Sequence, residues 1–205
     1  SGMKNVAALL LSHPELKEKI GGISLMGGGI THGNWTPAAE FNIWIDPEAA
    51  KIVLDCGAKI TLVPLDATHE CYLTVEDAAD LRALGNKAGK FAAELLDFFA
   101  RGGDAHLHDP CAVAWIIDPS IVTSAYLHVD IELDGTLTRG MTVTDLRPLQ
   151  GNRPEADIDL DTMKRWNDAP EGSPFRGLMP NTHVGLRLDA DKFNALVLET
   201  LRNYN

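Results

Sequence analysis

The sequence has few cysteines, few basic residues and no long apolar run, and each shortage excludes a class of protein. Its three cysteines are widely spaced and form no C-x-x-C pair, which argues against a zinc cluster and is typical of reduced thiols in a cytoplasmic protein. The 18 lysines and arginines stand against 29 aspartates and glutamates, and the net charge of -11 disfavours nucleic-acid binding. No apolar run approaches the ~20 residues that span a bilayer, and no signal peptide precedes the first helix. We therefore expect neither a nucleic-acid partner nor a membrane partner.

The composition and the apolar pattern indicate a globular α/β protein. Of 205 residues, 45% are hydrophobic and 23% are charged, which suits one substantial core. Continuous apolar runs predict strands and helical spacing predicts helices. The expected strands are 23–26, 59–65 and 182–188. The expected helices are 5–20 with Asn5 as N-cap, a segment from 40 or 47 to 55, 75–100 with a break near Gly85, 111–117, and 191–203. This alternation predicts a single domain over 1–205 with a mainly parallel sheet and flanking helices.

Two further segments have their own signals. Tyr126–Leu133 and Thr138–Leu146 alternate on either side of Asp134-Gly135, which predicts a β-hairpin. Residues 150–181 hold several prolines, glycines and acidic residues, and we expect an irregular, exposed loop there.

The richest polar cluster lies in Gly33–Asn42, after a predicted strand and a glycine-rich loop. Ligands of open α/β sheets bind at such positions. Asn34, Glu40 and Asn42 supply two amides and a carboxylate, which suit vicinal hydroxyls that both donate and accept hydrogen bonds. The alternative is structural: Asn34 would shape the loop, and Glu40 and Asn42 would cap the following helix.

His108-Asp109-Pro110 is the second candidate, at the point where a loop becomes a helix. The functional interpretation is a carboxylate for a hard cation beside an imidazole that can donate a proton. The structural alternative places Asp109 at the N-cap and Pro110 at the first helical position. His32, His69 and His106 have no partner carboxylates at metal-site spacing, so we assign them no role.

Several long motifs in order resemble the inosine-uridine-type nucleoside hydrolases. They occur along most of residues 4–150 and again near the end. They are Leu25–Gly29, Gly33–Ala50, Pro64–His69, Leu107–Pro110, Ile117–Pro119, Thr138–Thr142 and Val184–Asp191.

The resemblance implies a calcium-dependent enzyme that hydrolyses the N-glycosidic bond of ribonucleosides through an oxocarbenium-like transition state. By the same resemblance, Asn34, Glu40 and Asn42 match contacts to the ribose hydroxyls, and Met26 matches a methionine that lines the pocket. Asp109 matches a Ca²⁺ ligand. His108 matches the histidine that protonates or orients the leaving base.

The family's Asp-rich segment, D-x-D-x-x-x-D-D, is absent from the sequence. It supplies most of the metal carboxylates and the base that activates water. We therefore expect a chain that corresponds to the C-terminal two-thirds of the family, lacks the N-terminal strands and is inactive alone. The alternative is a non-catalytic nucleoside- or sugar-binding module completed by another polypeptide. Because missing strands would expose apolar surface, we also expect a homo-oligomer.

Overall fold

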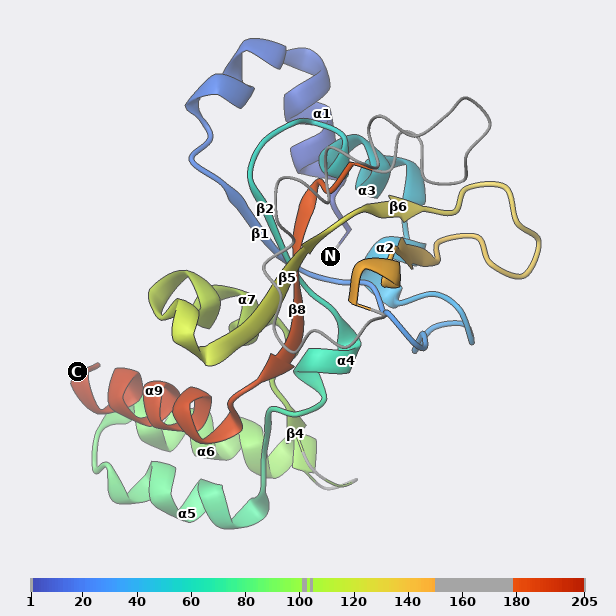
Figure 1. Cartoon of the computed structure of the whole chain (residues 1–205). Coiled ribbons are helices and arrows are strands. Elements are labelled where there is room, and N and C mark those ends of the chain that lie inside the picture. The colour runs from blue at the N-terminus through green and yellow to red at the C-terminus, as the bar shows by residue number, and fades with distance from the viewer. Residues whose placement is uncertain (1, 101–102, 104, 150–178, 205) are drawn as a thin grey trace, which may run out of the picture. The chain divides into compact units, whose positions relative to one another are not determined.

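The structure is a computed structural model that describes residues 2–100, 103, 105–149 and 179–204 (Figure 1). The chain divides into two compact units. The first takes in residues 1–66 and 124–186, and the second takes in residues 67–123 and 187–205. The expected single domain over 1–205 stays a prediction. Of the loop expected at 150–181, residues 150–178 lie outside the described part of the chain.

A four-stranded sheet organises the first unit and confirms the α/β prediction. Its order is β1-β2-β8-β5, and β5 and β8 each continue into the second unit. β2 runs parallel to β1, with Ile60 opposite Ile23, and parallel to β8, with Thr61 opposite His183. The strands are β1 (Ile23–Met26), β2 (Ile60–Val63), β5 (Val122–Leu127) and β8 (Thr182–Leu188).

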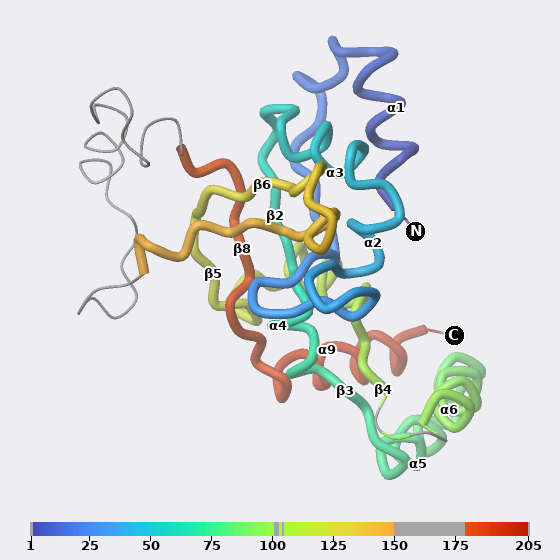
Figure 2. The backbone as a smooth tube through the Cα atoms, turned by 90° about the vertical axis from the view of Figure 1, so that its right-hand side faces the viewer, coloured from blue at the N-terminus to red at the C-terminus, as the bar shows by residue number. Residues whose placement is uncertain are grey.

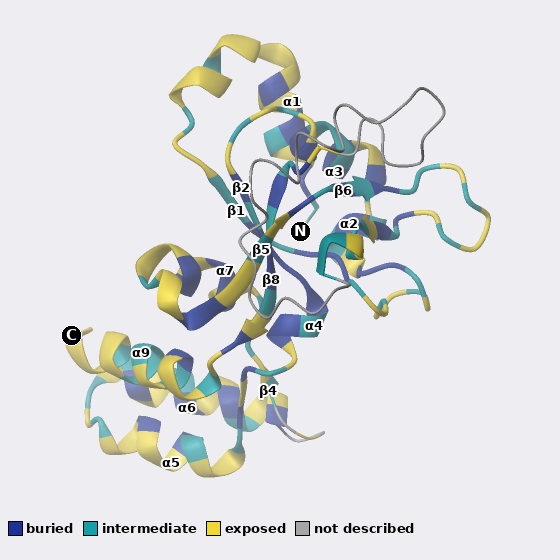
Figure 3. Ribbon diagram, viewed as in Figure 1, coloured by how far each residue is buried: buried dark blue, intermediate teal, exposed yellow. Residues whose placement is uncertain are grey.

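Helices cover the sheet in the first unit and bury its apolar side chains. Leu25, Leu62 and Val184 of the sheet share one core with Val53 of α3 (Pro47–Leu54). Figure 3 shows buried stretches along β2 and β8. Such strands are apolar because parallel sheets are covered on their faces. The helices are α1 (Lys4–Ser12), the 3₁₀ helix η1 (Pro14–Lys19), α2 (Phe41–Trp44), α3 (Pro47–Leu54) and α4 (Leu65–Thr68), which ends in the second unit.

The helix expected at 5–20 is wrong in two respects. α1 ends at Ser12, because Pro14 disfavours a helical conformation at His13 and cannot donate a backbone hydrogen bond. The N-cap is Met3 rather than Asn5, and no side chain caps this helix.

The second unit consists mainly of packed helices. α5 and α6 lie side by side (Figures 1 and 2), and α6 and α7 both contact α9. The break near Gly85 is confirmed, since Gly85 adopts φ +71° between α5 and α6. The elements are β3 (Tyr72–Leu73), α5 (Val75–Ala83), α6 (Lys87–Phe99), β4 (Ala105–His106), α7 (His108–Ile117), the 3₁₀ helix η3 (Pro119–Ile121) and α9 (Ala190–Asn203). No helix in the described ranges is both long and apolar enough to cross a membrane.

The predicted hairpin exists, but both of its strands are shorter than predicted, and Tyr126 and Leu127 belong to β5 of the main sheet. β6 (Val129–Ile131) pairs antiparallel with β7 (Thr142–Thr144), and Ile131 lies opposite Thr142; the 3₁₀ helix η4 (Arg147–Leu149) follows. The predicted strands left only residues 134–137 between them, whereas residues 132–141 connect β6 to β7.

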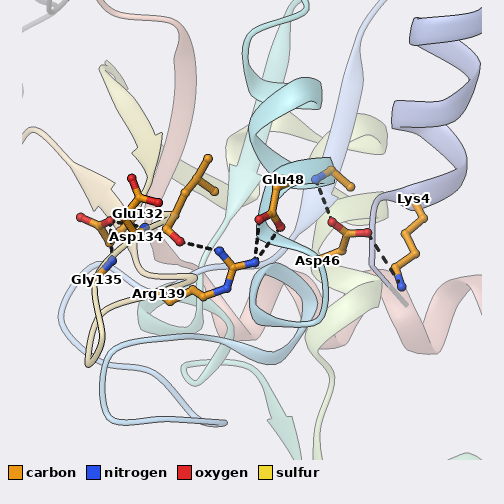
Figure 4. A network of polar contacts seen from close by, with 9 residues as sticks. Lys4, Asp46, Glu48, Glu132, Asp134, Gly135 and Arg139 are labelled. Atoms are coloured by element: carbon orange, nitrogen blue, oxygen red, sulfur yellow. Dashed lines mark hydrogen bonds and ion pairs between the residues drawn. The ribbon is translucent and has the colours of Figure 1, made fainter.

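Side-chain contacts explain the longer connection between β6 and β7. The Glu132 carboxylate accepts hydrogen bonds from the backbone of Asp134 and Gly135 at 2.8 and 3.0 Å. Arg139 donates to the Leu133 carbonyl and forms two bonds to Glu48 of α3 (Figure 4). The connection is therefore held to α3 as well as closed on itself.

Candidate functional site

The loop before α2 folds around a single backbone carbonyl. The carbonyl of Ala39 accepts from the backbone N–H groups of Asn34, Trp35 and Thr36 at 3.1 to 3.3 Å. A Cβ on Gly33 would lie 2.3 Å from the Thr36 carbonyl oxygen, so only glycine fits there. The loop is thus a fixed turn that ends at the N-terminus of α2.

Glu40 is the N-cap of α2, and its side chain is 2% exposed. One carboxylate oxygen accepts from the Asn42 N–H at 2.9 Å. The other accepts from the Gly28 N–H at 2.9 Å and from the Ile43 N–H at 3.2 Å. Glu40 therefore ties the glycine-rich loop after β1 to the first turn of α2, as the structural alternative for this residue expected.

Asn34, Asn42 and Met26 lie around this carboxylate. The Asn34 Oδ1 accepts from the Phe41 N–H at 3.0 Å. The Asn42 Nδ2 donates to the carbonyl of Met26 at 3.4 Å and contacts its sulfur at 3.3 Å. Asn42 lies within α2 and does not cap it, contrary to the structural alternative. Through Glu40 and α2, the four predicted residues form one connected cluster at the carboxyl end of β1.

Asp66 is an organising residue of the same unit that the sequence pattern did not single out. Its carboxylate accepts from the Ile30 N–H at 2.6 Å and from the Thr31 N–H at 3.1 Å, and it also binds the Thr31 hydroxyl. It therefore holds the far end of the glycine-rich loop. The available signal was its place in the motif Pro64–His69, directly after β2.

Gly28 and Thr142 make a close approach beneath this loop. Gly28 adopts φ +73°, and a Cβ there would lie 2.4 Å from the Thr142 Oγ1. That hydroxyl is buried and has no hydrogen-bond partner among the described residues. A buried hydroxyl without a partner is unfavourable.

We expect Thr142→Val to raise the free energy of unfolding by about 1 kcal/mol, because valine keeps the shape and removes the unpaired hydroxyl. Chemical denaturation measures the change. The matched control is Thr74→Val, which removes a hydroxyl that caps α5 by accepting from the Asp77 N–H and should lose about 1 kcal/mol. If Thr142→Val lost as much free energy of unfolding as Thr74→Val, the Thr142 hydroxyl would not be unpaired and the expectation would be wrong.

His108 lies in the second unit, at the first position of α7. Its Nδ1 lies 2.7 Å from the Thr68 Oγ1, and its ring contacts those of His69 and His106. Burial lowers the pKa of His108, the two neighbouring rings lower it further, and Asp109 opposes them. At neutral pH the ring is therefore neutral, and it can orient a ligand as a hydrogen-bond donor or acceptor.

Asp109 lies in the first turn of α7, and the prediction that it is the N-cap is wrong. The N-cap is Leu107, and no side chain caps the helix. The helix begins before Pro110, so the proline falls at its third position instead of its first. Asp109 is exposed at this helix start, a location that suits a negative charge. Among the described residues, no group of three or more His, Cys, Asp or Glu could hold a metal ion.

Comparison with known proteins defines the family. The model of the inosine-uridine preferring nucleoside hydrolases matches residues 2–195, so the chain belongs to this family. The pyrimidine-specific ribonucleoside hydrolase RihA of Escherichia coli K12 is 48% identical over 165 residues, which are 77% of this chain and 53% of RihA. The chain thus spans about half the length of the curated relatives that it matches.

Solved structures show the same fold. The purine-preferring ribonucleoside hydrolase from Gardnerella vaginalis superposes with a TM-score of 0.78 at 33% identity, over 98% of this chain and 58% of that protein. The plant nucleoside hydrolase PpNRh1 superposes with a TM-score of 0.78 at 29% identity, over 100% of this chain and 60% of that protein.

Proposed function

We propose that the first unit provides ribose-binding residues for hydrolysis of the N-glycosidic bond of ribonucleosides, and that the second unit provides the histidine that acts on the leaving base. The observation that carries the proposal is the connected cluster of Met26, Asn34, Glu40 and Asn42 at the carboxyl end of β1. Family membership supports the reaction, and its relatives include both purine-preferring and pyrimidine-specific enzymes. The products would be ribose, which gains the hydroxyl of water at C1′, and the free base, which gains the proton.

The contacts within the cluster indicate which residues have a structural role and which can bind a ligand. Three backbone N–H groups already occupy most of the acceptor positions of the Glu40 carboxylate, which has about four. Glu40 therefore acts mainly by holding the loop and α2 in place. Asn34 is exposed and Asn42 is half-buried, so their amides are the groups in this cluster that can reach ribose hydroxyls.

His108 and Asp109 would act on the other parts of the reaction. His108 would form a hydrogen bond to the leaving base, which disperses the charge that develops as the C1′–N bond breaks. Asp109 would contribute one oxygen to a bound Ca²⁺. Because Ca²⁺ prefers about six to eight oxygens, and the described residues offer no group of three ligands, they do not fit a complete calcium site.

We accordingly expect the chain alone to bind Ca²⁺ with a dissociation constant of about 1 mM or weaker, since one exposed carboxylate competes poorly with water. Calorimetric titration of the full chain measures this affinity, and Asp109→Asn is the matched variant. Micromolar affinity that survives in Asp109→Asn would contradict the assignment of Asp109.

A second candidate function is a non-catalytic module that binds nucleosides. It is favoured because the described residues offer no group of three metal ligands. Incubation with uridine, cytidine or inosine, followed by chromatography of the free base, separates the two candidates. Base release that Asn42→Ala abolishes supports hydrolysis. Binding of the same nucleosides without release supports the module, and neither binding nor release would defeat both.

We also propose that the chain self-associates through the second unit. Phe91, Phe98 and Phe99 of α6 are 64%, 63% and 69% exposed, and Leu95 lies beside them. These four side chains form an apolar face of roughly 400 Å², which is large for a surface that meets only water. Two charged residues of α6, Lys90 and Glu94, lie beside this apolar face. Lys90 and Glu94 pair with each other at 4.0 Å, so the charges beside this face balance within the helix.

We expect sedimentation equilibrium at tens of micromolar to show a dimer, because a two-fold contact covers this apolar face on both copies. Replacing Phe91 and Phe98 with serine should shift the chain to monomer. The matched control replaces the exposed Val113 of α7 with serine. A folded wild-type monomer at these concentrations would contradict the proposal.

A further inference from the structure

Thr68 is a buried polar residue whose side chain touches the histidine of the proposed site. It is the last residue of α4, the short helix after β2, and it is fully buried. Its Oγ1 lies 2.7 Å from the His108 Nδ1, the separation of a good hydrogen bond. Residues 68 and 108 are distant in sequence, so this contact depends on the packing of the second unit.

Two other rings restrict the orientation of His108. The His69 ring meets it edge-on with centroids 5.4 Å apart, and the His106 ring stacks on it at 5.7 Å. Tyr72 in turn contacts His106 at 5.7 Å. The ring is thus packed against neighbours while its Nδ1 is engaged by Thr68, and Nε2 is the nitrogen left for a ligand.

We propose that Thr68 is a positioning residue that donates its hydroxyl proton to the His108 Nδ1 and so keeps the proton of the neutral ring on Nε2. That N–H then points away from Thr68 and forms the hydrogen bond to the leaving base. The contact of Nε2–H to the leaving base rests on the proposed function. The hydrogen bond between Thr68 and His108 does not depend on it.

A neutral imidazole has one N–H donor and one nitrogen with an acceptor lone pair. This decides whether the Thr68 hydroxyl donates to the His108 Nδ1 or accepts from it. If Thr68 accepted from Nδ1–H, Nε2 would present a lone pair. A lone pair repels a base that gains electron density as the glycosidic bond breaks. Only donation by Thr68 gives an outward N–H without full protonation of the ring, and a base oxygen or nitrogen can accept from it.

Long-range ¹H–¹⁵N NMR of the full chain, at a pH where the ring is neutral, tests the hydrogen bond without substrate. We expect the wild type to show a protonated Nε2 and an unprotonated Nδ1 at His108. Thr68→Ser, which keeps the hydroxyl, should retain this signature, and Thr68→Val should show a mixture of tautomers. A wild-type ring protonated at Nδ1, or an unchanged spectrum in folded Thr68→Val, would overturn the proposal. If Thr68→Val does not fold, the wild-type and serine spectra still decide it.

Steady-state kinetics of base release tests the consequence. Thr68→Val should lower kcat about tenfold with KM unchanged, because part of the contribution of a positioned proton donor is lost, and Thr68→Ser should restore kcat. Thr123→Val, at an exposed position of β5, is the matched control. Equal kcat in Thr68→Val and wild type would overturn the positioning role. If no nucleoside is hydrolysed while the tautomer signature holds, the proposed function fails and the Thr68 hydrogen bond stands.

Discussion

Glu40→Gln should lower the free energy of unfolding by about 2–4 kcal/mol, one of the two largest effects of a single substitution that we expect. The glutamine amide is nearly the same shape, but its NH₂ group must face a backbone N–H where a carboxylate oxygen now accepts. At least one of the N–H groups of Gly28, Asn42 and Ile43 then loses its partner in a buried place. Denaturant unfolding followed by circular dichroism measures the change.

Glu48→Gln is the matched control for Glu40. Glu48 also lies in the first turn of a helix, α3, but its carboxylate is exposed and pairs with Arg139. Exposed ion pairs contribute at most about 1 kcal/mol. Equal losses at the two positions would show that Glu40 acts as an ordinary helix-terminal charge, and the account of the cluster would then be wrong.

Asn86→Ala should destabilise the second unit by about 2–4 kcal/mol, because one side chain serves two helix ends. The Asn86 Oδ1 accepts from the Gly89 N–H at 2.8 Å and caps α6. Its Nδ2 donates to the carbonyls of Leu201, Arg202 and Tyr204, at 2.7, 3.3 and 3.0 Å, at the C-terminal end of α9. Thermal and denaturant unfolding would show the loss.

Asn86→Asp separates the two contributions of this side chain. Aspartate keeps the capping oxygen for α6 but removes the donor to α9 and brings a negative charge to its carbonyls. We expect its loss to approach that of Asn86→Ala. Asn5→Ala, at an exposed position of α1 without a capping role, should change stability little. A stable Asn86→Asp variant would show that α9 does not depend on this contact.

The regular elements could be predicted from the sequence because their signals are local. The apolar runs at β1 and β2 are continuous, as buried parallel strands require, and Gly85 marks a break that needs a positive φ. α6 begins at an asparagine N-cap, which is also a local signal. The family resemblance then correctly named the fold that these elements build.

Two of the errors lie where contacts between distant parts of the chain hold the backbone. The turn after β6 follows Glu132 and Arg139 instead of the local Asp134-Gly135 pair, and Arg139 is held by Glu48 of α3. α7 begins before Pro110, and the backbone N–H of its N-cap Leu107 donates to the carbonyl of Cys71 at 3.1 Å.

The polar residues near α2 could be named from the sequence, but their contacts could not. The spacing of Asn34, Glu40 and Asn42 shows that polar side chains gather near α2. It does not show that three backbone N–H groups occupy Glu40, nor that Asp66 holds the other end of the loop. The bonds from Gly28 to Glu40 and from Ile30 to Asp66 join residues that are distant in sequence, and only the fold brings them together.

The central claim is that the cluster at the carboxyl end of β1 binds the ribose of a ribonucleoside. NMR titration of the full chain with uridine tests it most directly, because backbone amide signals report where a ligand binds. We predict shifts at Asn34, Phe41 and Asn42, binding about tenfold weaker in Asn42→Ala, and weaker binding of 2′-deoxyuridine. Binding that leaves these amides unshifted, or that is equal for uridine and 2′-deoxyuridine, would contradict the claim.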